Sequence, residues 1–528
     1  MALTTISGTI QAQPLNDNFS YILDMTKVFV NVLSPPSPLV SAKGDGTLGD
    51  AIAIQAILNS YIGAIIIIPY TNSFYSIENT INVPSNTTLI INGTLKLANQ
   101  ANCVMFYLSN HTNIHIEGKG TLDGNKLNQT SPTGQGQIVE QGTIPGITAI
   151  ACGGCVAGIW QSNNGITHSR ISGLTFTSFN QWPMSLAGCT DVIVSDIKAL
   201  DCFNAWGFTQ SKDCHAINCF SQISGDMGFC FYGGCVNCSV ENMEASYSVA
   251  GISIYSDQYS VGACHDIIIK NCFCHDNIGA GIYINTTVGD EHYNILIDGN
   301  KCNGNNTFGY TSSGDISYNS MVKHVIITNN ESYNVLPPTA EGGTIAGIFV
   351  GGKCEDLIIK GNLILNAGIG KIGTGFGIYM TDLKINCLID SNIINDNQAT
   401  PTMQECIIIF GTDFDKKILV SNNILGNVRV GGMSAQLYTN SIGVVAKNNA
   451  GYNPVGLLST QPAIPASDVV QVNTNRVPVQ IFINGGTVTA IKLNGIATGL
   501  ISGAFTLSPD ETLTLTYSVA PTWTWFGL

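Results

Sequence analysis

Four segments between Gly165 and Asn242 repeat one short theme: THSRISGLTFTS (167–178), TDVIVSDIKAL (190–200), CHAINCFSQIS (214–224) and CVNCSVENMEA (235–245). Each contains a small or polar residue where the apolar run turns, namely Gly173, Asp196, Asn218 and Asn242. These residues are about 23 positions apart, and a fixed period of that size is typical of a repeat architecture. The rest of the chain extends or caps this stack.

The composition of the repeats predicts strands. Runs of Ile, Val and Thr three to six residues long are bounded by Asn, Gly, Ser and Asp, a pattern that indicates short strands joined by tight corners. Three short strands and their corners need about 22 residues, at roughly 3.3 Å per strand residue. We therefore expect an all-β fold in which each period is one coil of a right-handed, single-stranded parallel β-helix.

Composition and charge exclude several classes of partner. Only 11% of the 528 residues are charged, and 21 Lys and Arg against 35 Asp and Glu give a net charge of −14. That balance disfavours nucleic acid and anionic membranes. The N-terminus MALTTISGTI lacks a basic region followed by a long apolar stretch, and no later segment reaches about 18 uninterrupted apolar residues. We expect a soluble chain without a standard export signal.

The 17 cysteines are an odd number, and many stand beside apolar strand positions. Reduced cysteines stacked inside the coils are therefore favoured over a disulfide framework. The pairs Cys152/Cys155 and Cys235/Cys238 have zinc-like spacing, but no matching His or Cys pair follows at the usual distance. We expect neither a metal nor another cofactor.

Residues 7–24, SGTIQAQPLNDNFSYILD, have a short, polar and partly helical pattern. Together with Ile6 they resemble the N-terminal segment of bacteriophage tail proteins, especially tailspikes of phages that infect Gram-positive bacteria. The resemblance implies that residues 1–35 form an attachment segment and linker that joins the phage tail or baseplate. It also implies a virion protein that acts extracellularly on the bacterial surface.

After the linker, Gly44-Asp45-Gly46, Asp50, the helical stretch AIAIQAIL and the strand IIIIP resemble the opening of the pectate-lyase-like superfamily. There the acidic turn and helix cap the first open coil, because an exposed sheet end invites edge pairing. Asp45 and Asp50 are thus interpreted as structural. The string GTLDGN resembles a coil common to polysaccharide-acting β-helices, with Asp123 at a corner. Residues 36–448 are the predicted β-helix body.

Beyond Asn242 the corner residues recur about every 30 positions, at Asn271, Asn300, Asn330, Asn362, Asn392 and Asn423. The longer period leaves room for a projecting loop on each coil: YSDQYSVGACHD, TTVGDEHYN, FGYTSSGDISYNSM, PPTAEGG and GTDFDKK. A wall of loops beside a stack of flat strands makes a groove, which suits a long polymer ligand.

Residues 449–528 alternate apolar and polar positions around Gly-Gly and Pro-Asp turns, a pattern that predicts a small antiparallel β-sandwich. This segment resembles the C-terminal modules that close and trimerise phage β-helical spikes, so a homotrimer is implied. Trp523 and Trp525 pack either between subunits or within one chain.

Three coils align on Gly207, Gly228 and Gly251 and resemble polygalacturonase coils in outline. Asp226 fits the first aspartate of that family's pair, but Trp206, Met227 and Ala250 replace its other aspartates and its histidine, so that mechanism is not supported. Asp226 is a candidate general acid, or alternatively a corner residue, and Trp206 a candidate sugar-stacking surface.

Asp257 follows the strand ISIYS, and Asp290 and Glu291 lie in the next loop. Glycosidases need two carboxyl groups about 5 to 10 Å apart. Asp257 and Glu291 meet that need if the loop folds back, whereas eight strand residues would hold Asp226 roughly 26 Å from Asp257. Solvated loop charge is the alternative interpretation of this acidic cluster.

A lyase instead requires a base beside a uronate carboxylate and a cation to neutralise it. Lys212, Tyr255, His265 and His292 are available for these roles, and Lys212, Tyr255, Asp290 and His292 with Trp206 are the predicted substrate-binding residues. Scarce arginine and net acidity weigh against a lyase.

The sequence thus predicts a homotrimeric tailspike whose β-helix binds and cleaves a host-surface polysaccharide. The expected activity is endo-glycoside hydrolysis by a carboxylate pair, with Asp257, Glu291 and Asp226 as the candidates. A polysaccharide lyase on the same fold and a non-catalytic receptor-binding spike remain as alternatives.

Overall fold

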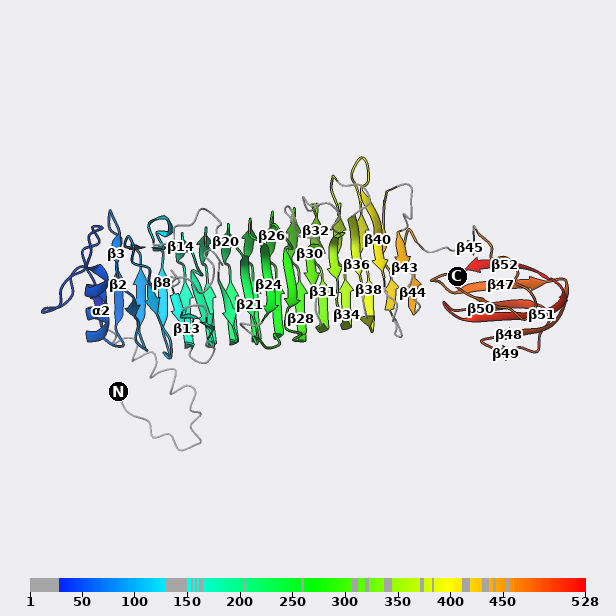
Figure 1. Ribbon diagram of the computed structural model, residues 1–528, viewed down its shortest axis with the longest axis horizontal. Helices are drawn as coiled ribbons and strands as arrows, with labels where there is room; N and C mark the ends of the chain where they lie inside the picture. Colours follow the sequence, from blue (N-terminus) through cyan, green and yellow to red (C-terminus); the bar gives the residue numbers. More distant parts are fainter. Residues whose placement is uncertain are drawn as a thin grey trace, which may run out of the picture. The chain divides into compact units, whose positions relative to one another are not determined.

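A computed structural model describes residues 28–129, 150–152, 155–156, 159–160, 165–202, 206–257, 261–305, 312–318, 322–336, 344–370, 375–381, 384–410, 418–429, 436–439, 443–452, 456–458 and 460–528. Three parallel sheets alternate along the chain, so each coil visits sheet A, then sheet B, then sheet C. Figure 1 shows the strands of each sheet side by side in chain order. The predicted parallel β-helix is confirmed.

The chain divides into two compact units, residues 1–198 and 199–528. In the first unit, sheet A contains β1 (Phe29–Asn31), β2 (Ile65–Ile68), β5 (Thr88–Ile91), β8 (His115–Gly118), β13 (Thr167–Ser172) and β16 (Thr190–Ser195). Sheet B contains β3 (Tyr75–Ile77), β6 (Thr94–Leu97), β9 (Thr121–Asp123), β14 (Thr175–Thr177) and β17 (Lys198–Leu200), which includes the boundary. Sheet C contains β4 (Ile81–Asn82), β7 (Phe106–Tyr107), β10 (Ile150–Cys152) and β15 (Met184–Ala187). Outside the three sheets lie the short helix η1 (Lys126–Asn128) and the antiparallel pair β11 (Cys155–Val156) and β12 (Ile159–Trp160).

In the second unit, sheet A contains β19 (Lys212–Ile217), β22 (Val236–Glu241), β25 (His265–Lys270), β28 (His292–Asp298), β31 (Val322–Thr328), β34 (Cys354–Lys360), β37 (Lys384–Ile385), β38 (Cys387–Asp390), β41 (Ile418–Ser421) and β44 (Val444–Lys447). Sheet B contains β20 (Phe220–Gln222), β23 (Glu244–Ser246), β26 (Phe273–His275), β29 (Lys301–Asn303), β32 (Glu331–Tyr333), β35 (Leu363–Leu365), β39 (Ile393–Asn395) and β42 (Ile424–Leu425). Sheet C contains β18 (Trp206–Thr209), β21 (Met227–Tyr232), β24 (Ala250–Ser256), β27 (Ile282–Thr286), β30 (Ser312–Tyr318), β33 (Thr344–Val350), β36 (Gly375–Met380), β40 (Met403–Ile409) and β43 (Leu437–Thr439).

The helix α2 (Asp50–Ser60) caps the first coil, as the sequence predicts. It packs against β3 and β4, and the Gln55 side chain both donates to the Asn82 carbonyl and accepts from the Asn82 N–H, at 3.0 and 2.6 Å. The edge strand of sheet C is thereby covered. The buried Asp50 carboxylate accepts the N–H groups of Lys43 and Ser76 at 2.6 and 2.9 Å. Asp50 is therefore a structural residue.

The corner between sheets A and B uses the left-handed backbone conformation. Positive φ angles occur at Gly173, Asp196, Asn218, Asn242 and Asn271, with values from 53° to 78°. Gly, Asn and Asp adopt this conformation most readily, which explains why the sequence theme repeats them. From the next coil on, the residues at this corner are Gly299, Asn329, Gly361, Ser391, Asn422 and Asn448.

The later asparagines of the sequence pattern occupy a second corner position, one residue further on. Asn300, Asn330, Asn362, Asn392, Asn423 and Asn449 are each 2% exposed or less. The Asn362 amide donates to the Ile327 carbonyl and to Asn392 Oδ1, at 3.0 and 2.9 Å. Asn362 Oδ1 accepts both the N–H and the side-chain amide of Asn330, at 2.9 and 3.0 Å. The asparagines that form one series in the sequence therefore occupy two positions. Asn271 is at the exposed corner, and the later ones form the buried ladder.

The structure describes the side chains of 15 cysteines, which exclude Cys152 and Cys155. None of these 15 is in a disulfide, and 14 of them are buried. Several thiols donate to the carbonyl two residues earlier, as Cys214 does to Lys212 at 3.2 Å. Cys214 and Cys238 directly precede His215 and Ser239, which are Cα partners in adjacent coils, so the two small thiols occupy equivalent positions in the stack. The expectation of reduced, stacked cysteines agrees with this arrangement.

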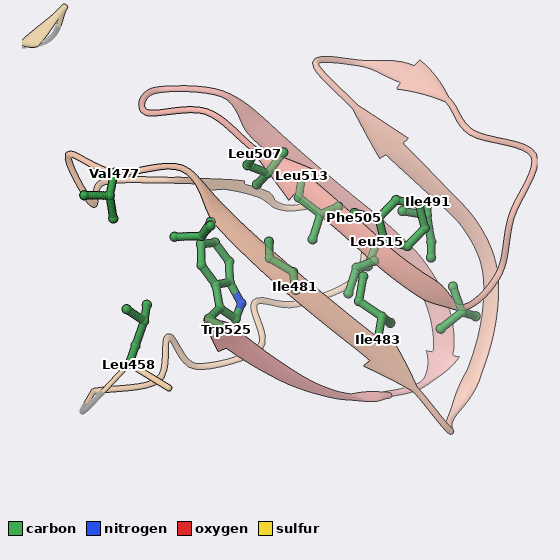
Figure 2. Close-up of a cluster of buried hydrophobic side chains, with 12 residues drawn as sticks. Leu458, Val477, Ile481, Ile483, Ile491, Phe505, Leu507, Leu513, Leu515 and Trp525 are labelled. Atoms are coloured by element: carbon green, nitrogen blue, oxygen red, sulfur yellow. The ribbon is translucent and has the colours of Figure 1, made fainter. Parts of the chain in front are cut away.

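The C-terminal strands form two antiparallel sheets. One contains β45 (Gly456–Leu457), β52 (Thr522–Gly527), β47 (Val479–Asn484) and β50 (Gly503–Leu507). The other contains β46 (Val470–Val472), β51 (Thr512–Val519), β48 (Thr487–Leu493) and β49 (Ile496–Ala497). Their inner faces enclose an apolar core around the fully buried Trp525, which Figure 2 shows beside Ile481. Trp523 packs against this core and its indole N–H donates to the Pro462 carbonyl at 2.8 Å, so both tryptophans make contacts within one chain.

The outcome of several other expectations depends on which residues the structure describes. Residues 1–27 of the predicted N-terminal segment lie outside the described residues, as do the loops PPTAEGG and GTDFDKK, whereas Phe29–Asn31 of that segment is strand β1 of sheet A. Ser312–Tyr318, expected within a projecting loop, is strand β30 of sheet C, because its alternating residues continue the parallel register of Ile282 with Ile316. The predicted domain division at residues 35 and 448 stays a prediction. No helix in the described part of the chain is long and apolar enough to cross a membrane.

The asparagine ladder can be tested with Asn362→Ala. The substitution leaves two donors of Asn330 and the Ile327 carbonyl without their partner, and each unsatisfied buried group costs about 1–3 kcal/mol. We expect a loss of about 3 kcal/mol or more in the free energy of unfolding, measured by denaturant or thermal unfolding.

The matched control is Asn329→Gly, at the exposed corner one residue before the ladder. Glycine already occupies this corner at Gly299 and Gly361, so only the surface hydrogen bond to Asp298 is lost. Equal destabilisation by the two variants would contradict the role assigned to the buried ladder.

Candidate functional site

The outer face of sheet C carries a polar cluster on β21 and β24. Phe229 and Phe231 of β21 point inward and are fully buried. Cys230, which lies between them, and Tyr232, which follows Phe231, therefore point outward. In the parallel register Tyr232 lies beside Tyr255. Their rings are stacked, with centroids 5.9 Å apart and planes 2° from parallel. Two phenol rings from adjacent coils therefore stand together on the outer surface.

Asp257 directly follows β24 and joins this pair. Its carboxylate accepts a hydrogen bond from the Tyr232 hydroxyl at 2.5 Å. Burial, together with this hydrogen bond and the negative charge of Asp257, raises the pKa of Tyr232 far above its usual value. Burial and the same charge also raise the pKa of Tyr255. Both phenols are thus held in the protonated, hydrogen-bond-donating form.

Asp226 directly precedes β21 and is half-buried. Its carbonyl accepts the Val249 N–H of the next coil at 2.8 Å, which fixes the backbone at this point. Burial raises the pKa of the Asp226 carboxyl to about 6; the charge of Asp257 adds to this rise, and a hydrogen bond from the Met227 N–H opposes it. Asp226 therefore holds a proton in mildly acidic solution, which an ordinary surface aspartate does not.

Asp226 and Asp257 act on each other across the same surface. Both charges also raise the pKa of the Cys230 thiol, after the larger effect of its burial. Such interactions fade within about 10 Å in salt solution, so the straight-strand separation of roughly 26 Å is too long. A Cβ on Gly228 would face Ala245 and Ser221 in the interior, and Phe229 is buried as well, so two successive residues point inward and the strand is irregular at Gly228.

Glu291, the predicted partner of Asp257, points elsewhere. Its carboxylate pairs with Lys323 at 3.1 Å, and the same ammonium lies 3.7 Å from Glu355. These three side chains come from successive coils at the start of sheet A strands. Asp290 accepts the Gly262 N–H at 2.7 Å and fixes the preceding loop. Both acidic residues thus have structural partners in the described chain.

Two predicted substrate-binding residues are inaccessible. Trp206 is fully buried, with its ring 4.8 Å from Phe229, so it has no free face for a sugar and the stacking role is wrong. His292 is fully buried as well. Its Nδ1 accepts the Cys264 N–H at 2.9 Å, and Nε2 lies 3.2 Å from the Asn285 carbonyl. That pattern assigns a neutral ring with the proton on Nε2, which ties two coils together and leaves no edge for substrate.

Lys212 begins β19 of sheet A and is exposed, with its ammonium 3.9 Å from Asp213. It lies on a different sheet from the two tyrosines.

Tyr232, which the sequence analysis missed, could be found from the aligned strings GFCFY and GISIY. When Gly228 and Gly251 are superposed, both tyrosines fall in one column. That alignment does not reveal the hydrogen bond from Tyr232 to Asp257, because no spacing rule reports a contact between coils.

Among the described residues, no group of three or more His, Cys, Asp or Glu side chains has the geometry to hold a metal ion. An open depression in the first unit is lined by Asn92, Glu117, Lys119 and Asp196, among other residues. It contains none of the predicted site residues, so the outer face of sheet C is the site with the clearest chemistry.

No family model and no curated protein matches this sequence. Among solved structures, the chain is similar to a tailspike protein variant of E. coli bacteriophage HK620, with 12% identity, a TM-score of 0.53, and 96% of this chain and 93% of that chain covered. It is also similar to an N-terminal fragment of bacteriophage phi29 gene product 12, with 15% identity, a TM-score of 0.61, and coverage of 83% and 74%. The chain has a tailspike-like fold.

A third similar structure is the A-module of the Azotobacter vinelandii mannuronan C-5 epimerase AlgE6, with 14% identity, a TM-score of 0.52, and coverage of 80% of this chain and 99% of that module. At identities this low, the structural similarity establishes the tailspike-like β-helix fold alone. The chemistry must be argued from the residues of this chain.

The raised pKa of Asp226 predicts a pH-dependent stability. In the unfolded chain the value is near 3.8, and in the folded protein it is about 6. The folded state therefore binds the extra proton between these values, so this carboxyl lowers stability as pH rises from about 4 to 6. Asp226→Asn is neutral at every pH. We expect the variant to exceed the wild type in stability by on the order of 1–3 kcal/mol at pH 7.5 and to show no such gain at pH 4.

The measurement is denaturant unfolding of both proteins at the two pH values. Glu331→Gln, at the surface of sheet B, serves as the control for charge removal in general. A variant that is less stable than the wild type at pH 7.5 would show that Asp226 is held ionised by the fold.

Proposed function

We propose that this protein is a phage tailspike depolymerase that cleaves a host-surface polysaccharide by endo-glycoside hydrolysis. The observation that carries the proposal is that two carboxyls influence each other: the charge of Asp257 helps to raise the pKa of Asp226 to about 6, and Asp257 is hydrogen-bonded to Tyr232. Glycosidases use one carboxyl as the acid and a second as nucleophile or base. The tailspike-like fold supports the biological setting.

In this mechanism Asp226 donates its proton to the glycosidic oxygen as the bond to the leaving sugar breaks. Asp257 is the second carboxylate, and the Tyr232 hydroxyl orients it by hydrogen bonding. It either attacks the anomeric carbon or removes a proton from the attacking water, depending on the separation of the two carboxyls. Tyr255 borders the same surface through its stacked ring and contributes to substrate binding.

The surroundings of the cluster favour hydrolysis over elimination. A lyase needs a strong base and a cation beside the uronate carboxylate. Here the shifted pKa values of Tyr232 and Tyr255 disfavour their phenolate forms, and the negative charge of Asp257 repels a uronate. Lys212, the cation considered from the sequence, is on sheet A. A lyase and a non-catalytic spike are therefore outcomes of the test below.

The proposal includes a homotrimer that attaches to the phage tail or baseplate through residues 1–35 and acts outside the host cell. Apolar side chains on the C-terminal sandwich support self-association: Phe482, Ile496 and Ile501 are 45%, 75% and 60% exposed. Closed cyclic symmetry would cover such a surface in each subunit. No cofactor is part of the proposed reaction.

The experiment incubates the protein with purified capsule, exopolysaccharide and wall polysaccharides of candidate hosts, following reducing ends and ultraviolet absorbance. We expect new reducing ends without absorbance, a loss of at least about 100-fold in rate for Asp226→Asn and Asp257→Asn, and unchanged binding. Glu331→Gln is the matched control on sheet B. The rate should fall above pH 6 as Asp226 loses its proton.

Two results would redirect the assignment. Cleavage abolished by Glu291→Gln but not by Asp226→Asn would return the site to the loop pair of Asp257 and Glu291. Products that absorb in the ultraviolet would identify a lyase, and binding without any cleavage would identify a receptor-binding spike.

A further inference from the structure

The outer column that begins in the carboxyl cluster continues along sheet C. In direct Cα register, each residue beside the next, this column contains Cys230, Ser253, Tyr283, Ser317, Phe349, Tyr379, Ile408 and Tyr438. The inward neighbours Ile348, Ile378 and Ile407 are buried in the coil interior. The same face that carries Asp226 and Asp257 therefore also carries the aromatic side chains of the later coils.

These aromatic side chains form a connected platform of five residues: Phe349, Phe376, Tyr379, Phe410 and Tyr438. Phe349 and Tyr379 are stacked with centroids 5.6 Å apart, and Phe410 contacts Tyr438 edge-on at 5.4 Å. Tyr379, Phe410 and Tyr438 are only partly buried. Aromatic rings of this kind offer a flat apolar face together with a polar hydroxyl edge.

Glu405 lies inside this platform. It is the Cα partner of Phe376, and the next residue, Cys406, points inward with its thiol on the Ile394 carbonyl, so Glu405 points to the outer side. It is 1% exposed, and its Oε2 has no hydrogen-bond partner among the described residues. Burial raises the pKa of the Glu405 carboxyl to about 7, and a hydrogen bond from Gln404 partly opposes this rise. A buried acceptor without a partner is costly to keep.

We infer that the platform and Glu405 form a binding site for the polysaccharide chain, beside the proposed cleavage site. The apolar faces of successive sugars would pack on Tyr379, Phe410 and Tyr438, and a sugar hydroxyl would bond Glu405 Oε2. A hydroxyl-rich polymer supplies the missing partner of Glu405, whereas an apolar protein surface would bury that oxygen unpaired. This inference rests on the proposed function, because it places the cleaved chain along sheet C.

The spacing of the coils sets the length of chain involved. β33 is three coils beyond β24, and β43 is six. At roughly 4.8 Å per coil, the platform extends from about 14 to about 29 Å from the coil of Tyr255. A chain bound across both regions is held several sugars away from the bond that is cleaved. The products are therefore oligosaccharides with a narrow size range.

The test compares Tyr379→Ala and Tyr438→Ala with Tyr333→Ala, a tyrosine on sheet B whose ring lies 5.5 Å from the Lys301 ammonium. Binding is measured by calorimetry with the same panel of purified capsule, exopolysaccharide and wall polysaccharides, in the Asp226→Asn background so that no chain is cut. We expect the dissociation constant to rise at least 10-fold for the platform variants and to stay unchanged for Tyr333→Ala. Tyr379→Phe, which keeps the ring, should retain binding.

Cleavage in the unmodified background gives a second readout. The platform variants should raise KM for long chains, broaden the product sizes, and leave kcat on short oligosaccharides unchanged. Glu405→Leu should weaken binding while raising the thermal midpoint, and Glu405→Gln should retain binding. If Glu405 served only the fold, Glu405→Leu would not weaken binding while raising the thermal midpoint.

Three results would overturn the inference: unchanged binding and product size in the platform variants, the same losses in Tyr333→Ala, or dissociation of an oligomer by Tyr379→Ala in sedimentation. The last result would identify the platform as a subunit interface. If the wild type binds a polysaccharide but never cleaves it, the proposed hydrolase fails while the binding test still decides the platform. If it binds none of the panel, both proposals fail.

Discussion

The structure depends on hydrogen bonds that run from coil to coil, and the buried asparagine ladder is their most demanding element. Within the ladder, Asn362 Oδ1 accepts both the N–H and the side-chain amide of Asn330, and the Asn362 amide donates to Asn392 Oδ1. A coil cannot change its length at this corner without leaving buried groups unpaired. Variation in coil length is therefore confined to other connections, including the segments between sheets C and A near the candidate site.

The fixed register is also what assembles the carboxyl cluster. Tyr232 and Tyr255 are 23 residues apart in sequence, yet the parallel pairing places them side by side with stacked rings. The charge of Asp257 also contributes to the raised pKa of Asp226. A rigid scaffold of this kind holds the candidate site residues in place without the entropy cost of ordering a loop.

Both unusual carboxyls reduce stability as the structure stands. Asp226 and Glu405 lose hydration on folding, which raises their pKa values to about 6 and about 7. A fold with many apolar coils tolerates such costs, because each buried Ile or Phe contributes roughly 1.5–3 kcal/mol. Strain of this sort tends to persist where a side chain serves binding or chemistry.

The sequence alone determined the repeat, the coil length, the capping helix and the sandwich, because strand patterning and corner residues are local signals. It also singled out Asp226, Asp257 and Tyr255. Only the tertiary structure decided which side chains meet: Trp206 turned inward, Glu291 paired with Lys323, and Tyr232 joined Asp257. Inward and outward orientation flips with one residue of register or one bend, and contacts between coils depend on pairing that no short stretch of sequence encodes.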